Sequence, residues 1–167
     1  MTETEFERYV RMYYKNVCTA AFCYLKNHSD ADDVAQDVFL RLYTSGNSFA
    51  SDEHAKAWLL RCAINKSADM LRSYWYRFSQ PLESAADIQY ADNSGAGELL
   101  GLLNGLKPKI RIAMYMHYYE GYSVAELSKL LNISESSVRS RLMRGRKQMK
   151  AMLDDERNED NGFQRDF

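Results

Sequence analysis

The sequence has little proline, no long apolar run and no strand-like alternation of apolar and polar residues. Two prolines and eight glycines in 167 residues are too few for a turn-rich all-β architecture. No stretch approaches the roughly 18 consecutive apolar residues of a membrane span, and the first residues lack the basic and apolar segments of a signal peptide. These absences favour a cytoplasmic, all-α protein without stable membrane insertion.

Cysteine and histidine are also sparse. Cys18, Cys23 and Cys62 form no CxxC pair, and the three histidines are scattered. This spacing indicates neither a structural zinc site nor a disulfide framework. Reduced thiols that fill space as small apolar side chains are the simplest interpretation. We therefore expect no metal ion and no cofactor.

Helical periodicity dominates the chain instead. Apolar residues recur at three- and four-residue steps along residues 5–26, 30–43 and 53–75. Ser29 or Asp30 is the expected N-cap of the second of these helices. Four further helices are expected, over residues 98–106, 108–120, 123–131 and 135–153.

Composition divides these helices into two groups. Residues 81–97 contain one proline, two glycines and several small polar residues, which predicts a linker. The sequence therefore predicts two small helical domains, residues 1–80 and 98–153. Residues 154–167 carry six acids against two bases and are expected to form a disordered acidic tail.

Positive charge is concentrated in the second domain, although the whole chain has a net charge of −1. Residues 107–153 carry ten bases against three acids, and residues 139–150 alone hold six Lys or Arg and no acid. A local excess of this kind points to a polyanionic partner for this part of the chain only.

The same region has the pattern of a helix-turn-helix. Ser123 with Glu126 fits a capping box, which predicts the start of a helix. Residues 132–134 are a turn of the length that joins two helices at a steep angle. Ser134 then caps the second helix. At 100° per residue, the packed side of this helix holds Val138, Leu142, Gly145 and Met149.

The opposite side of the second helix suits the major groove of DNA. Arginine side chains reach guanine edges or phosphates, and serines allow close approach. A solvated basic surface is the simpler alternative, but six bases without one acid argue against it. The outward and flanking residues are Ser136, Ser137, Arg139, Ser140, Met143, Arg144 and Lys147.

Over residues 5–153 the sequence resembles the extracytoplasmic-function (ECF) branch of bacterial RNA polymerase sigma factors. The segments DADDVAQDVFLRLY and WLLRCAINKSADMLR look like sigma region 2, and the segment that contains VRSRLMRGR looks like sigma region 4. The resemblance implies a transcription initiation factor, and not an enzyme, that directs core RNA polymerase to promoter DNA. It also implies regulation by an anti-sigma factor.

The resemblance further implies roles for individual residues. Arg139, Ser140, Met143 and Arg144 match residues that contact the −35 element. Asn65 matches the position that reads a base flipped out of the −10 element, and residues 44–54 match the loop that forms its pocket. The helix over residues 30–43 matches the surface that docks on the clamp helices of the polymerase. Its expected contacts are Asp33, Gln36, Asp37 and Arg41.

Several points stay open at this level. Asp30 and Asp33 also favour a helix N-terminus by themselves, and Trp58 is expected in the core. The loop over residues 44–54 has no basic residue, so the promoter preference of the family does not transfer. A stand-alone helix-turn-helix regulator remains an alternative. An enzyme is another, because DDVAQD weakly resembles the metal motifs of helical isoprenoid synthases, although no second acidic motif is visible.

Overall fold

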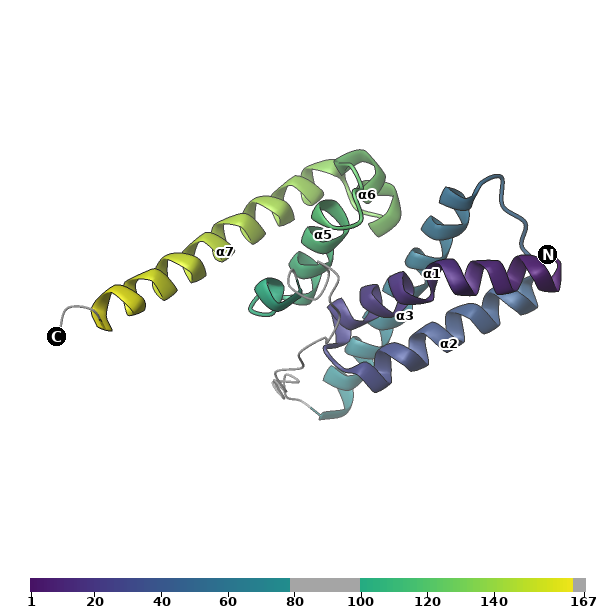
Figure 1. Cartoon of the computed structure of the whole chain (residues 1–167), viewed down its shortest axis with the longest axis horizontal. Helices are drawn as coiled ribbons and strands as arrows, with labels where there is room; N and C mark the ends of the chain where they lie inside the picture. The colour runs from purple at the N-terminus through teal and green to yellow at the C-terminus, as the bar shows by residue number, and fades with distance from the viewer. Residues whose placement is uncertain (79–99, 164–167) are drawn as a thin grey trace. The chain divides into compact units, whose positions relative to one another are not determined.

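The computed structural model describes residues 1–78 and 100–163, and the helices of these residues are drawn in Figure 1. No strand occurs among the described residues, which confirms the all-α fold. The chain divides into two compact units, Met1–Gln89 and Tyr90–Phe167. The predicted linker, residues 81–97, lies outside the described residues, so the predicted domain limits stay a prediction.

The first unit is built from α1 (Glu3–Leu25), α2 (His28–Ser45) and α3 (Asp52–Phe78), each packed against the other two. A capping box between Thr2 and Glu5 begins α1, as the Glu5 backbone amide donates to Thr2 Oγ1 at 3.2 Å. Apolar residues at helical spacing then face inward and are fully buried. They include Val17, Ala21, Val34, Leu42, Leu59 and Leu60.

The start of α2 differs from the sequence prediction. The N-cap is Asn27, and not Ser29 or Asp30; its side chain accepts from the Asp30 backbone amide at 3.0 Å. Lys26 ends α1 in the left-handed conformation, with φ of 50°, so the chain turns at once and Asn27 already lies in the extended cap conformation. Residues 28–30 are therefore the first turn of the helix.

The second unit contains a helical turn at residues 100–103, followed by α5 (Pro108–Tyr118), α6 (Val124–Leu131) and α7 (Glu135–Phe163). Pro108 stands in the first turn of α5, where a missing backbone N–H is tolerated. α7 packs on both α5 and α6. The interior of the unit is formed by Leu103, Ile112, Met116, Leu127 and Val138.

Gly145 allows α5 and α7 to approach closely. A Cβ at this position would lie 2.6 Å from Met114 Cγ and 3.1 Å from Ile110 Cγ2, closer than side chains normally pack. Gly145, predicted on the packed side of α7, therefore lies at the contact between α5 and α7.

The first turn of α5 is also fixed by Arg111, a buried residue whose guanidinium donates to the Leu106 carbonyl at 2.8 Å.

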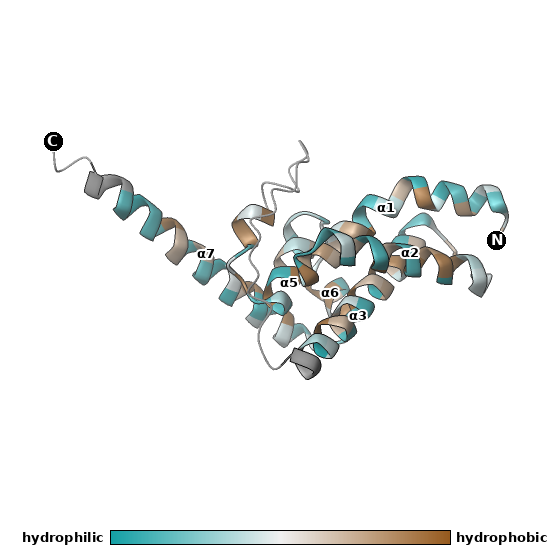
Figure 2. Cartoon of the chain, turned by 90° about the horizontal axis from the view of Figure 1, so that it is seen from below, coloured by the Kyte–Doolittle hydropathy of each residue, from teal (hydrophilic) through white to brown (hydrophobic). Residues whose placement is uncertain are grey.

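The C-terminal part of α7 differs from the expected disordered tail. The helix continues through residues 154–163, and Figure 2 shows that hydrophilic residues predominate along the coloured part of this extension. Ala151, Met152 and Leu153 are strong helix formers and favour continuation of the helix into residues 154–163. Met152 also packs back on the unit, because a Cβ at Gly105 would lie 2.7 Å from Met152 Cε.

We predict that Leu142→Ala destabilises the second unit by about 2–5 kcal/mol, because it leaves a cavity where a side chain only 2% exposed now packs. Met143→Ala is the matched control: Met143 is 59% exposed, and its truncation is expected to change stability by at most about 0.5 kcal/mol. Urea denaturation followed by circular dichroism measures both effects. Trp58 and Trp75, the two tryptophans, lie in the first unit and should report an unchanged transition there. Equal losses for the two variants would contradict the described packing.

Candidate nucleic-acid interface

The predicted helix-turn-helix is confirmed in the second unit. Ser123 and Glu126 form the capping box: the Glu126 backbone amide donates to Ser123 Oγ at 3.2 Å, and the Ser123 amide donates to the Glu126 carboxylate at 2.8 Å. The hydrogen bonds that the carboxylate accepts from Ser123, first from its backbone amide and then from its hydroxyl, hold the pKa of Glu126 below its usual value. Asn132 ends α6 in the left-handed conformation, with φ of 53°. The turn over residues 132–134 is further closed by Ser128, whose hydroxyl donates to the Ile133 carbonyl at 2.6 Å.

Ser134 caps α7 as expected. Its Oγ accepts from the Ser137 backbone amide at 3.1 Å and donates to the Ser137 hydroxyl at 2.9 Å. The Ser137 hydroxyl is therefore part of the cap, although the residue is exposed, whereas the side chain of Ser136 points to no described partner. The start of α7 thus presents short side chains beside a helix N-terminus, which carries a partial positive charge.

The two faces predicted for α7 agree with the observed burial. Val138, Leu142 and Gly145 are buried, and Met149 is half-buried. On the other side, Ser140 is half-buried and the remaining predicted residues are exposed. These exposed residues are Ser136, Ser137, Arg139, Met143, Arg144 and Lys147.

The basic side chains of α7 are not equally available. Arg139 forms an exposed ion pair one turn back, with 3.5 Å between its Nη1 and Glu135 Oε2. Arg146 donates to the Tyr118 hydroxyl of α5 at 3.1 Å and so lies away from the predicted DNA-facing side. Arg144 and Lys147 form no ion pair with any residue that the structure describes. These two exposed cations are therefore available to an external anion.

In the first unit, α2 carries the predicted docking face. Asp33, Gln36 and Asp37 are all exposed and share one side of the helix by their three- and four-residue spacing. Leu40 continues the same stripe and is 61% exposed. The sequence analysis missed this residue, although an apolar side chain three positions after Asp37 falls on the polar side of the helix and was a readable signal.

Arg41, the fourth predicted contact, is exposed but also contacts a residue of its own unit. Its guanidinium carbon lies 5.8 Å from the centre of the Trp58 ring, a cation–π arrangement. Trp58 was expected in the core and is half-buried instead, at the edge where α2 and α3 meet. Its position depends on Phe49, whose ring centroid lies 5.8 Å away.

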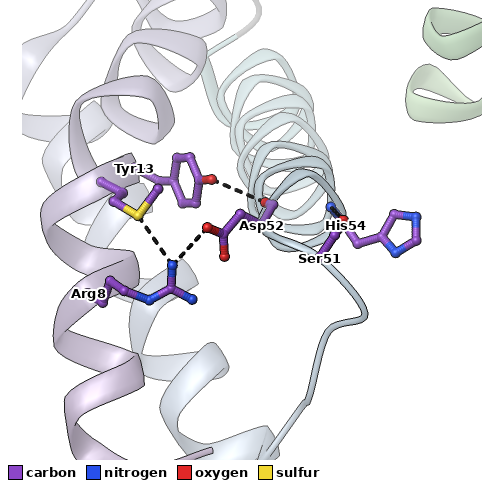
Figure 3. Close-up of polar contacts among 6 residues, drawn as sticks. Arg8, Tyr13, Ser51, Asp52 and His54 are labelled. Carbon is purple, nitrogen blue, oxygen red and sulfur yellow. Dashed lines mark hydrogen bonds and ion pairs between the residues drawn. The ribbon is translucent and has the colours of Figure 1, made fainter.

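The loop between α2 and α3 is held at several points. Phe49 also meets Tyr9 of α1, with 5.9 Å between ring centroids. Arg8 of α1 forms an ion pair of 2.8 Å with Asp52, and the Tyr13 hydroxyl donates to the Asp52 carbonyl at 3.2 Å (Figure 3). The hydrogen bond from Arg8 lowers the pKa of Asp52, and the same bond raises the pKa of Arg8. The loop therefore enters α3 from a defined position.

Asn65 is exposed on α3, more than three turns after this loop ends. Its neighbour Lys66 is also exposed and forms an ion pair with Asp37 of α2, with 2.8 Å between Nζ and Oδ2. The predicted docking face is thus joined to the residue that follows the predicted −10 residue in the sequence. Sequence periodicity alone could not have revealed this pairing, because it connects two helices.

The three cysteines are free thiols. Cys18 is buried and donates to Asp32 at 3.5 Å; burial, together with the Asp32 carboxylate, raises the pKa of Cys18 to about 12. Such a thiol stays protonated at neutral pH and is a poor nucleophile or metal ligand. Across residues 1–78 and 100–163, no three His, Cys, Asp or Glu side chains gather closely enough to hold a metal ion. No described helix is both long and apolar enough to cross a membrane.

Comparisons with known proteins agree on the two units. Residues 9–77 match the family described as Sigma-70 region 2, and residues 96–149 match Sigma-70, region 4. The ECF RNA polymerase sigma factor SigM of Mycobacterium tuberculosis is 28% identical over 152 residues, which cover 89% of this chain and 76% of that protein. SigW of Bacillus subtilis, another ECF RNA polymerase sigma factor, is 28% identical over 152 residues, covering 80% of this chain and 81% of its own.

Solved structures show the same fold. The sigma factor RpoE from Bartonella quintana, crystallised with the anti-sigma factor NepR, has a TM-score of 0.74 at 19% identity. The match covers 90% of this chain and 97% of the RpoE chain. CnrH, solved with the cytosolic domain of CnrY, has a TM-score of 0.65 at 26% identity. The match covers 92% of this chain and 90% of CnrH. A chain with sigma regions 2 and 4 is a transcription initiation factor. This chain belongs to the ECF family of RNA polymerase sigma factors.

We predict that Asp52→Asn lowers the stability of the first unit at neutral pH, because it removes the ion pair with Arg8. The pKa of Asp52 is lowered in the folded chain, so the pair contributes fully above the unfolded pKa and is lost as the pH falls through the folded pKa. The urea midpoints of wild type and variant, followed by tryptophan fluorescence, should therefore differ at pH 7 and converge in acid. A difference that persists unchanged in acid would show that the ion pair does not hold the loop.

Proposed function

We propose that the two units of this sigma factor divide promoter recognition between them. The second unit reads the −35 duplex through the outward side of α7. The first unit docks on core polymerase through α2 and captures an unpaired base of the −10 element through Asn65. The chain performs no catalysis of its own and works in the cytoplasm, where core polymerase and promoter DNA are found. The observation that carries this proposal is an α7 whose apolar side is buried while its basic side is exposed.

The DNA-reading role is supported by the way α7 is held. Val138 and Leu142 fix the rotation of the helix, and the capped N-terminus leaves short serine side chains at the front. Arg144 lies about two turns further along and can donate two parallel hydrogen bonds to a guanine edge. The exposed ion pair between Arg139 and Glu135 is weak enough to be exchanged for a DNA contact.

The polymerase-docking role is supported by the composition of α2. Asp33 and Asp37 provide negative charge on one exposed stripe, and Leu40 provides an apolar contact beside them. An apolar side chain surrounded by polar ones is the usual arrangement at the centre of a protein interface. We propose that a basic helical surface of core polymerase, its clamp helices, binds here, with Leu40 as the apolar anchor.

The melting role is supported by the position and chemistry of Asn65. A side-chain amide has both donor and acceptor atoms and can satisfy the edge of a flipped base. The residue is exposed on a regular helix, so the amide is available without local rearrangement. The loop over residues 44–54, anchored by Phe49 and Asp52, is the proposed wall of the pocket.

We also propose that an anti-sigma factor regulates this chain. The support is the resemblance in fold to RpoE of Bartonella quintana, which was crystallised with its anti-sigma factor NepR. A regulator that covers Asp33, Gln36 and Asp37 would block docking on core polymerase and leave the arginines of α7 untouched. Such a regulator would inhibit the binding of core polymerase directly and the binding of promoter DNA only as a consequence.

We predict that Arg144→Ala weakens promoter selection by about 1–3 kcal/mol, the range for a lost bidentate base contact. Run-off transcription with core polymerase, on templates with the native and a scrambled −35 sequence, measures the effect. The loss should appear on the native template and vanish on the scrambled one. Arg157→Ala, which removes an exposed arginine further along the same helix, is the matched control and should leave both templates unaffected. An equal loss on both templates would indicate a phosphate contact for Arg144 instead.

We predict that Asn65→Ala leaves affinity for core polymerase intact and impairs opening of the duplex, because a base-binding amide acts only after a base has left the stack. Permanganate footprinting of the −10 region measures opening, and a pre-melted template should recover much of the lost transcription. A defect of equal size on closed and pre-melted templates would mean that Asn65 has a structural role.

A further inference from the structure

One ion pair connects α2 to α3 at the surface of the first unit. Lys66 Nζ lies 2.8 Å from Asp37 Oδ2, and the two side chains are 47% and 55% exposed. Among the other ion pairs between described residues, those of Arg11, Arg72 and Arg139 stay within one helix. The pair of Arg8 with Asp52 joins α1 to the start of α3.

This ion pair lies between the two surfaces of the first unit that are proposed to bind polymerase and DNA. Asp37 stands between Gln36 and Leu40 on the exposed stripe that is proposed to dock on core polymerase. Lys66 directly follows Asn65, the residue proposed to capture a −10 base. A single hydrogen-bonded ion pair therefore spans the proposed polymerase surface and the proposed DNA surface.

The chemistry of the pair favours an exchange of partners. Lysine carries three donors and no acceptor on a long flexible stem, and it binds phosphate as a point charge. Asp69, the nearest acid along α3, is engaged by Arg72, so Asp37 is the carboxylate that holds Lys66. Ion pairs with this exposure contribute little free energy, so replacing one partner by another is inexpensive.

We propose that Lys66 is a phosphate-binding residue of the −10 surface and that Asp37 restrains it until core polymerase engages α2. In the free chain, Lys66 is paired with Asp37. When basic groups of the polymerase bind Asp37, Lys66 is released and contacts a backbone phosphate beside the base held by Asn65. The inference rests on the proposed function, since it assumes that α2 and α3 bind polymerase and DNA respectively.

The first test measures the free protein with a fluorescent single-stranded DNA oligonucleotide, by anisotropy over a salt series. Asp37→Asn should raise affinity about two- to fivefold at low salt, the range expected when a weak ion pair no longer competes. The slope of log affinity against log salt should become steeper by roughly 0.7, the value for one additional phosphate neutralised on a single strand. The double variant Asp37→Asn with Lys66→Gln should lose both changes.

Glu7→Gln is the matched control, because it removes one carboxylate from the exposed pair of Glu7 with Arg11 and changes the net charge equally. Its effect should be clearly smaller than that of Asp37→Asn. Equal gains for the two single variants would mean that net charge alone is responsible. A gain that persists without Lys66 would likewise overturn the proposal.

The second test uses core polymerase and relies on the reciprocity of coupled binding. Lys66→Gln frees Asp37, so the affinity for core should rise by up to about fivefold, whereas Arg11→Gln should leave it unchanged. Opening of the promoter by the Lys66→Gln holoenzyme should nevertheless become weaker and less sensitive to salt. Lower affinity for core would contradict the restraint, and unaltered opening would contradict the phosphate contact.

Different results would overturn the proposed function and the inference about Lys66 and Asp37. If the wild-type chain with core polymerase yields no promoter-directed transcript, the proposed function is wrong. If transcripts form normally but neither test depends on the pair of Lys66 with Asp37, only the present inference is wrong.

Discussion

The contact of α7 with α5 and α6 is the constraint on which the proposed DNA-binding surface depends. Val138, Leu142 and Gly145 are buried in it, and the missing side chain of Gly145 lets Met114 pack directly on the helix backbone. This contact fixes the rotation of α7 about its own axis. Arg144 and Lys147, which pair with no described residue, are placed by that rotation. The apolar side of the helix thus determines what the basic side can reach.

The helices of the first unit also have a buried apolar side and an exposed polar side. Its three described helices bury their apolar faces against one another and expose polar stripes on α2 and α3. Those stripes are close enough for Asp37 and Lys66 to pair. The same packing that stabilises the unit therefore brings the surface proposed to bind polymerase beside the surface proposed to bind DNA. We propose that an exposed ion pair between these surfaces responds to either partner without a change in the core.

Local features of the sequence predicted the second unit well. The capping box of Ser123 with Glu126, the turn over residues 132–134 and the buried stripe of α7 each depend on a few neighbouring residues, and each was confirmed. The cap of α2 was predicted two or three residues too late, because the pattern did not show that Lys26 turns the chain sharply before Asn27. The contact of Arg41 with Trp58 depends on packing between α2 and α3 and was not predicted. The extension of α7 beyond residue 153 depends on helix propensity that a count of acidic residues does not reveal. The roles of Asn65 and of the residues on α2 came from family resemblance and stay predictions.

The central claim is that promoter recognition requires both units together with core polymerase. Binding to a mapped promoter duplex, compared at one salt concentration for the chain alone, core alone and the two together, tests it most directly. We expect sequence-specific binding only by the combination, because the free chain offers one reading helix and a proposed base pocket that duplex DNA cannot fill. Tight, sequence-specific binding by the free chain, unchanged by core polymerase, would contradict it and would indicate a stand-alone helix-turn-helix regulator.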